Sequence, residues 1–271
     1  MLSNIAKTLM RRFESRKARL KLARHVDRGE LIHQRYGTVY GGWFVPGGVL
    51  TETSVCYCVG AGEDISFELE LIREFGCEVY TFDPTPRATQ HIAELYENTA
   101  KNLPSRINGS DTLKYEVNRE GLAHLHFLPY GVWSENQTMK FYSPVDSTHV
   151  SHSILNLQRT DHYFEAECRT VGTIMESLGH KDLSLLKLDV EGAEHKVIRS
   201  LLDEGIRPTI LCVEFDEGVV SPDEDYMSPI LDTVSRLKQC GYLMTKLESW
   251  NATFVSISKL AAGTPMSAEQ V

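Results

Sequence analysis

Acidic side chains follow three short apolar runs of the chain, and together they could form one ligand-binding cleft. Asp83 follows residues 78–82, Asp189 ends residues 185–189, and Glu214 lies at the end of residues 209–215. In an open α/β sheet, ligands bind outside the carboxyl ends of the strands, where such side chains meet. An acid after the second strand can also accept hydrogen bonds from ribose hydroxyls, which points to an adenosine-containing ligand.

A glycine-containing turn precedes the first of these acids. The segment VCYCVGAGEDISF runs from an apolar strand through Gly60, Ala61 and Gly62 into a helix. Glycines let a ligand approach the backbone closely, and the unpaired amides of a helix start favour a carboxylate or phosphate. A dinucleotide-binding turn needs a third glycine where Ile65 stands. The turn therefore favours a ligand that lacks a phosphate and presents an amino-acid end.

Several of these acids also have a purely structural interpretation. Asp83 could form an Asx turn ahead of Pro84. Glu191 and Glu194 could be ordinary acids of a helix start, where the helix dipole favours negative charge. We accept the structural interpretation for Glu194 and expect a functional role for Glu191.

Strand and helix patterns alternate through most of the chain, which predicts an α/β fold with a mostly parallel sheet covered on both faces. The strands are expected over residues 54–60, 78–82, 125–132, 139–142, 185–189, 209–215, 242–247 and 253–258, with 125–132 and 139–142 as hairpin partners. The helices are expected over residues 1–28, 65–75, 87–103, 171–178, 191–202 and 229–240. Residues 105–124 should be irregular, and residues 143–169 should form a loop or lid. The last two strands should form an antiparallel pair at one edge.

Segments within residues 50–217 resemble the FkbM-type methyltransferases. The phrase LLKLDVEGAEHKVIRSLL is similar to the family's most specific signature, and ILCVEFDE is similar to its next strand. CYCVGAGEDISFE and GCEVYTFDPTP also resemble a methyltransferase-like branch found in animals. The resemblance implies a Rossmann-like class I methyltransferase fold, whose mostly parallel seven-stranded sheet ends in an antiparallel edge hairpin.

The resemblance further implies S-adenosylmethionine as the cofactor. The glycine turn would hold its methionine part, the acid of the second strand its ribose, and the strand end at 130–132 would lie by the adenine. The expected cofactor-binding residues are Gly60, Ala61, Gly62, Asp64, Asp83, Pro84, Tyr130, Gly131, Val132 and Asp189.

The chain departs from the family pattern at two positions. The acid found two residues before the first glycine is replaced by Cys58, and a later glycine is replaced by Asp64. Asp64 or Glu63 could supply the missing charge toward the methionine amino group. The alternative is that cofactor binding has been lost.

The family mainly methylates hydroxyls, so we expect O-methylation of a small molecule such as a sugar or secondary metabolite. A hydroxyl nucleophile must be aligned with the methyl group and needs a proton acceptor. The candidate catalytic residues are Asp189, Glu191 and Glu214, with the two glutamates ranked first and the histidines of residues 149–162 as further candidates. The same three acids could bind Mg²⁺, and Asp146, His149 and His152 could bind a metal, but we expect no metal.

Three other functions remain open. A non-catalytic binding or scaffold protein would explain Cys58 and Asp64. An NAD-dependent oxidoreductase would share the broad fold but needs the missing glycine. A methyltransferase acting on RNA or protein is the third.

Charge is distributed unevenly along the chain. Residues 1–28 hold nine Lys/Arg and two acids, although the whole chain has a net charge of -9. A strongly acidic body is poorly suited to a long polyanion, so we expect no nucleic-acid partner. The basic segment could contact a membrane surface or RNA, but a solvated helix or an oligomer contact is the simpler interpretation, which leaves a homo-oligomer possible.

The remaining expectations concern organisation and location. We expect a basic helical extension over residues 1–36, a methyltransferase domain over 37–262 and a flexible tail over 263–271. No run approaches the ~20 apolar residues of a membrane span, and no apolar core follows the basic N-terminal residues as in a signal peptide. The six cysteines form no C-x-x-C pair and lie mostly in apolar runs, which favours reduced thiols and a cytoplasmic location.

Overall fold

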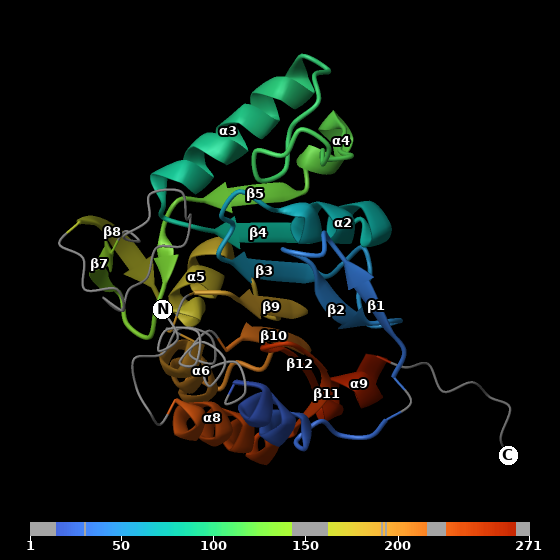
Figure 1. Ribbon diagram of the computed structural model, residues 1–271, viewed down its shortest axis with the longest axis vertical. Coiled ribbons are helices and arrows are strands. Elements are labelled where there is room, and N and C mark those ends of the chain that lie inside the picture. Colours follow the sequence, from blue (N-terminus) through green and yellow to red (C-terminus); the bar gives the residue numbers. More distant parts are fainter. Residues whose placement is uncertain are drawn as a thin grey trace, which may run out of the picture.

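The computed structural model describes residues 15–29, 31–142, 162–190, 192, 194–215 and 226–263. Its centre is a seven-stranded sheet, which confirms the predicted α/β class (Figure 1). The strands follow one another in space as β11 (Tyr242–Glu248), β12 (Asn251–Ser256), β10 (Ile210–Glu214), β9 (Leu185–Leu188), β3 (Val55–Val59), β4 (Glu78–Phe82) and β5 (Leu125–Leu128).

Strand direction divides the sheet into a parallel part and an antiparallel edge. β5, β4, β3, β9 and β10 pair in parallel, and β12 is antiparallel to both β10 and β11. The parallel strands are almost continuously apolar because both faces of such a sheet are covered. The predicted antiparallel pair is therefore confirmed, with the last strand of the chain inserted inside the sheet rather than at its edge.

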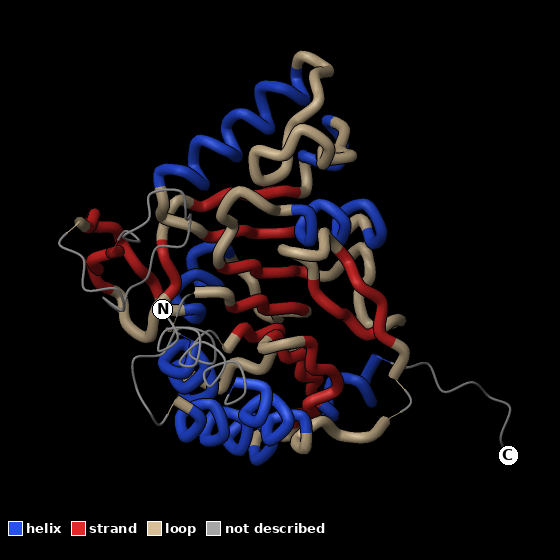
Figure 2. Tube along the Cα trace, viewed as in Figure 1, coloured by secondary structure: helices blue, strands red, loops and turns tan. Residues whose placement is uncertain are grey.

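Helices cover both faces of the sheet (Figure 2). One apolar cluster joins β3 to α2 (Ser66–Phe75) and α3 (Pro86–Ala100), and includes Leu122 of the short α4 (Arg119–Leu122). The other joins the opposite face to α5 (Val171–Leu178), α6 (Glu194–Asp203), α8 (Met227–Gln239) and a helix over residues 15–23. In the part of the chain that the structure describes, no helix is long and apolar enough to cross a membrane.

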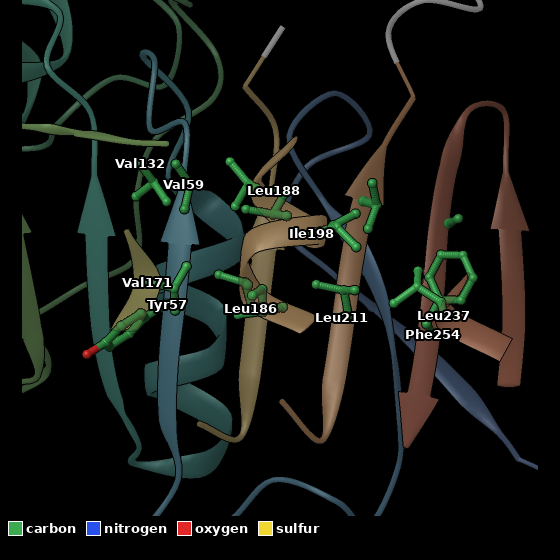
Figure 3. Close-up of a cluster of buried hydrophobic side chains, with 14 of the residues drawn as sticks. Tyr57, Val59, Val132, Val171, Leu186, Leu188, Ile198, Leu211, Leu237 and Phe254 are labelled. Carbon is green, nitrogen blue, oxygen red and sulfur yellow. The ribbon is translucent and has the colours of Figure 1, made fainter. Parts of the chain in front are cut away.

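Alternation along each strand separates the two apolar clusters. Tyr57 and Val59 of β3 point to the same side as Leu186 and Leu188 of β9, where they meet Ile198 of α6 (Figure 3). Burying each such side chain contributes about 1.5–3 kcal/mol. Because successive residues of a strand point to opposite faces, the intervening positions 58 and 187 lie on the side of α2.

The expected hairpin of residues 125–132 with 139–142 is wrong. β5 ends at Leu128 because Pro129 has no amide hydrogen to continue the ladder. Beyond it, β6 (Gly131–Val132) belongs to a separate three-stranded sheet in the order β6-β8-β7. Its other strands are β7 (Gln137–Tyr142) and β8 (Tyr163–Arg169), which pair antiparallel.

Other element boundaries differ in detail. β8 lies inside the expected loop of residues 143–169, of which residues 143–161 are outside the described chain. The expected helix over 191–202 begins at Glu194, and α9 (Ile257–Gly263) follows β12. A hairpin of β1 (His33–Tyr36) and β2 (Trp43–Pro46) precedes the sheet. It joins residues on both sides of position 36, where the basic extension was expected to end.

Candidate active site

The glycine turn after β3 lies directly against the end of β9. Gly60 has φ +87°, and a Cβ atom there would lie 2.1 Å from the carbonyl oxygen of Asp189. Its amide donates to the carbonyl of Phe82 at 3.0 Å, which ties the turn to the end of β4 as well. Only glycine combines this backbone conformation with so close an approach. The glycine turn, the end of β4 that precedes Asp83 (the acid expected to bind the ribose) and Asp189 therefore lie together at one edge of the sheet.

Asp83 supports the turn with both carboxylate oxygens. Oδ2 accepts hydrogen bonds from the amides of Ala61 and Gly62, each at 3.0 Å. Oδ1 accepts from the amide of Thr85 at 2.8 Å, which is the Asx-turn geometry of the structural interpretation. An ionised carboxylate has about four acceptor positions, so these bonds leave one for a ribose hydroxyl. Pro84 lies between Asp83 and Thr85, the N-cap residue of α3.

The two acids expected to compensate for Cys58 are paired within the chain. Asp64 accepts from the hydroxyl of Thr38 at 2.6 Å and from the amide of Ser66 at 3.0 Å, so it fastens the β1–β2 loop to the start of α2. Glu63 forms an ion pair with Arg87 at 2.8 Å. Both acids thus tie the residues after the glycine turn to neighbouring segments, Asp64 to the β1–β2 loop and Glu63 to α3.

A buried charge cluster lies beneath the turn, and the sequence analysis missed it. Lys187 is 2% exposed, and its Nζ donates to the carbonyl of Gly60 at 2.8 Å. The same nitrogen lies 3.4 Å from Glu68 Oε1 and 3.6 Å from Asp189 Oδ2. Burial lowers the pKa of Lys187, but the neighbouring carboxylates outweigh it and hold that pKa above its ordinary value. Lys187 is therefore an ammonium ion at neutral pH.

A signal for this cluster was present in the sequence. Lys187 is the one charged residue in the apolar run LLKL, and Glu68 lies on the apolar face of α2 with Ile65, Leu69 and Ile72. Charged side chains at buried positions are almost always paired. The pattern does not reveal which strand residue the helix residue meets.

Two predicted catalytic acids lie at adjacent strand ends. Leu188 of β9 is paired in register with Val213 of β10, so one further residue places Asp189 beside Glu214 on the α2 side of the sheet. The side chain of Asp189 is 32% exposed. The third acid, Glu191, lies outside the described residues. Glu194 is fully buried and accepts from the amides of Val190 and Gly192, as expected for a structural acid.

Only one of the three residues expected beside the adenine lies against the end of β4. Tyr130 contacts Phe82 with ring centroids 5.7 Å apart, and the guanidinium of Arg169 lies 4.4 Å from its ring centroid. Gly131 is required by packing, because a Cβ atom there would lie 2.6 Å from Cys168 Sγ. Val132 is buried in the core. Tyr130 is thus the side chain of this segment that adjoins the end of β4.

Among the described residues, no group of three His, Cys, Asp or Glu side chains could hold a metal ion. Asp146, His149 and His152 lie outside the described residues.

Comparison with known proteins gives a family. The family described as "Methyltransferase FkbM domain" matches residues 58–244, and no curated protein matches the chain. Among solved structures, S-adenosylhomocysteine-bound methyltransferase PaMTH1 of Podospora anserina is 10% identical with a TM-score of 0.38, covering 75% of this chain and 71% of that one. The fibrillarin/Nop5p complex is 8% identical (TM-score 0.41; 76% and 74% covered), and an rRNA methylase from Streptococcus thermophilus is 10% identical (0.36; 76% and 87%).

The residues at the turn fit S-adenosylmethionine. The backbone of Gly62 (φ +52°) faces open space, since a Cβ atom there would have no neighbour within 4 Å. A ligand can therefore approach the backbone closely at Gly62, while the three amides of the turn are already bonded within the chain. Asp83 keeps one acceptor position for the ribose, and Asp189 borders the same edge.

Proposed function

Because the chain belongs to the FkbM methyltransferase family and its cofactor is S-adenosylmethionine, we propose that it methylates a hydroxyl group of a small molecule such as a sugar or secondary metabolite. The observation that carries the proposal is the pair of carboxylates at the ends of β9 and β10, beside the glycine turn. A hydroxyl is a weak nucleophile, and a carboxylate within reach can accept its proton.

The residues have distinct roles in this proposal. S-adenosylmethionine supplies the methyl group when it is bound. The turn of Gly60, Ala61 and Gly62 holds its amino-acid end, and Asp83 accepts a ribose hydroxyl. Asp189 orients the acceptor hydroxyl at the cleft, and Glu214 or Glu191 takes its proton. The acceptor is thus aligned by one carboxylate and deprotonated by another.

A non-catalytic protein that retains the fold is the second candidate. It is favoured by Cys58 and by the internal pairing of Asp64 and Glu63, which leaves neither acid as an obvious partner for an ammonium group. For an NAD-dependent oxidoreductase, the buried Ile65 stands where a third glycine is needed. We also infer a cytoplasmic location, supported by six free cysteines, five of them buried.

The first experiment is calorimetric titration with S-adenosylhomocysteine, with NAD as the control ligand. We expect S-adenosylhomocysteine alone to bind, and Asp83→Ala to weaken it at least about tenfold, because three amides lose their acceptor. Asp182→Ala removes an exposed carboxylate and should leave binding unchanged. Binding of neither ligand would favour the non-catalytic protein, and binding of NAD would favour an oxidoreductase.

The second experiment identifies the acceptor class. Purified protein with isotope-labelled S-adenosylmethionine is offered separate pools of hydroxylated small molecules, RNA and protein. We expect label in the small-molecule pool, and Glu214→Gln should lower its transfer rate by about 10²–10⁴-fold without changing the Kd for S-adenosylhomocysteine. Should Glu191→Gln alone have this effect, Glu191 is the base. Label only in RNA or protein would contradict the proposal.

A further inference from the structure

A lysine and two cysteines lie side by side on three adjacent strands in the middle of the sheet, on the face that α2 covers. Cys58 of β3 is in register with Lys187 of β9, which is in register with Cys212 of β10. All three side chains are buried on the same face. Burial raises the pKa of the Cys58 and Cys212 thiols, so both are neutral at pH 7. The strands on either side of Lys187 therefore provide no negative charge at its level.

The counterion comes instead from the helix above: burial raises the pKa of Glu68, and the ammonium of Lys187 opposes that shift and favours the carboxylate. Glu68 of α2 is fully buried, and its Oε1 lies 3.4 Å from Lys187 Nζ. Its second oxygen, Oε2, is buried with no hydrogen-bond partner. Buried ion pairs are often no more stabilising than apolar residues of the same volume, and an unpaired carboxylate oxygen adds a further penalty. Stability alone is thus a poor reason for a glutamate at position 68.

Lys187 connects Glu68 to both parts of the proposed site. Its three N–H groups face three acceptors, namely the carbonyl of Gly60, Glu68 Oε1 and Asp189 Oδ2. The first bond fixes the peptide at which the glycine turn begins. The contact with Asp189 holds the acid at the end of β9. Displacement of Lys187 would therefore disturb the turn and the acid together.

We propose that Glu68 takes over the role of the carboxylate that the family pattern has at position 58 and that, through Lys187, it positions the glycine turn and Asp189 for the cofactor. The inference rests on the proposed function as far as cofactor binding is concerned. Glu68 acts through Lys187, so it is a positioning residue rather than a catalytic one. The missing strand acid is thus replaced from α2, and not by Asp64 or Glu63.

Moving the negative charge from position 68 to position 58 by substitution tests this proposal. Glu68→Gln preserves the shape of the side chain and removes its charge, and Cys58→Asp with Glu68→Gln returns the charge to β3. We expect Glu68→Gln to raise the Kd for S-adenosylhomocysteine at least tenfold, and the double variant to bring it back within about threefold of wild type. Glu74→Gln makes the same change at an exposed position of α2 and should bind like wild type.

Thermal unfolding without ligand separates the possible outcomes. Wild-type affinity in Glu68→Gln, with or without a lower Tm, would show a merely structural pair and overturn the proposal. A double variant that unfolds like wild type but still binds weakly would show that the charge cannot act from position 58. If the wild-type protein itself does not bind, the proposed function fails first. Recovery of Tm in the double variant would then still support the charge replacement, and no recovery would contradict it.

Discussion

At the scale of single residues, Asp83 and Glu194 hold the backbone of two loops in the same way. Asp83 accepts from the amides of Ala61, Gly62 and Thr85, and Glu194 accepts from those of Val190 and Gly192. Each carboxylate replaces the water that would otherwise bond these amides. The described residues of the loops at the ends of β3 and β9 are therefore held in place before any ligand arrives, which lowers the entropic penalty of binding.

The two glycines of the turn should respond differently to the same substitution. In Gly60→Ala the new Cβ atom would collide with the Asp189 carbonyl at 2.1 Å, in a backbone conformation that is itself unfavourable. We expect a loss of about 3 kcal/mol or more in the free energy of unfolding, together with loss of S-adenosylhomocysteine binding. Urea unfolding and calorimetry measure the two effects.

Gly62→Ala is the matched control for this prediction. Its Cβ atom would meet nothing within 4 Å, so only the backbone penalty of about 1 kcal/mol remains. Because that open space is where we place the ligand, binding should fall further than stability does. Equal destabilisation by the two substitutions would contradict the geometry of the turn.

The sequence was sufficient to predict where residues lie when their placement follows from their position on a strand. Gly60, Asp83 and Asp189 were found because parallel strands place their carboxyl ends at one edge, and the structure brings these three together. Lys187 and Glu68 were missed because their pairing depends on how α2 lies across the sheet. That packing is tertiary, and the periodicity of one segment does not contain it.

At the scale of elements, the sheet of β6, β7 and β8 contains a strand, β8, in a segment whose polar composition favours a loop. Residues 163–169, YFEAECR, alternate with period two: Phe164 and Cys168 face the core, while Glu165 and Glu167 lie among the polar positions. That alternation is the pattern of a strand with one buried face. Composition nevertheless favours a loop here, because the segment continues a stretch rich in Ser, His and Asp. Pro129 was likewise a signal that β5 ends before Tyr130.

The pairing of β4 with β5 includes an acid that should make stability depend on pH. Partial burial would raise the pKa of Glu78, but hydrogen bonds with His126 and His124, both at 2.7 Å, outweigh it and lower that pKa. A depressed carboxyl pKa contributes stability above the ordinary value of about 4.3, and this contribution is lost as pH falls through the lowered value. Because Glu78 is more than a third exposed, the effect should stay below about 1 kcal/mol.

Thermal unfolding from pH 7 to pH 3 measures this contribution. Glu78→Gln should lower Tm at pH 7, and the difference from wild type should shrink toward pH 3. Glu52→Gln changes an exposed acid in the loop before β3 and serves as the control. A difference that is constant over the whole pH range would mean that ionisation of Glu78 contributes nothing.

At the scale of the whole molecule, residues 15–29 are built into the far edge of the sheet. The amide of Asp27 donates to the carbonyl of Met244 at 2.7 Å, and its carboxylate accepts from the amide of Met244 at 2.9 Å. The same carboxylate pairs with Lys238 of α8 at 2.7 Å. Leu22, in the helix over residues 15–23, is fully buried in the core cluster of this face. This part of the basic segment is therefore anchored on the body.

Two leucines of the helix over residues 15–23 test whether this helix is part of the cooperative fold. Leu22→Ala removes a fully buried side chain and should lower the free energy of unfolding by about 2–5 kcal/mol. Leu20 is 60% exposed, and Leu20→Ala should change it by less than about 0.5 kcal/mol. Urea titration gives both values. Similar small changes in the two variants would mean that the helix is not part of the cooperative fold.

The order in which the sheet is completed differs from the order in which the ribosome makes it. β12 is synthesised after β11 but lies between β11 and β10, so β10 has no neighbour on that side until residues 251–256 have emerged. During translation the nascent chain therefore carries an apolar, unpaired strand edge, the kind of surface that recruits chaperones or aggregates. A stall or frameshift before residue 251 would leave a chain that contains every turn and acid described above and still cannot close its sheet.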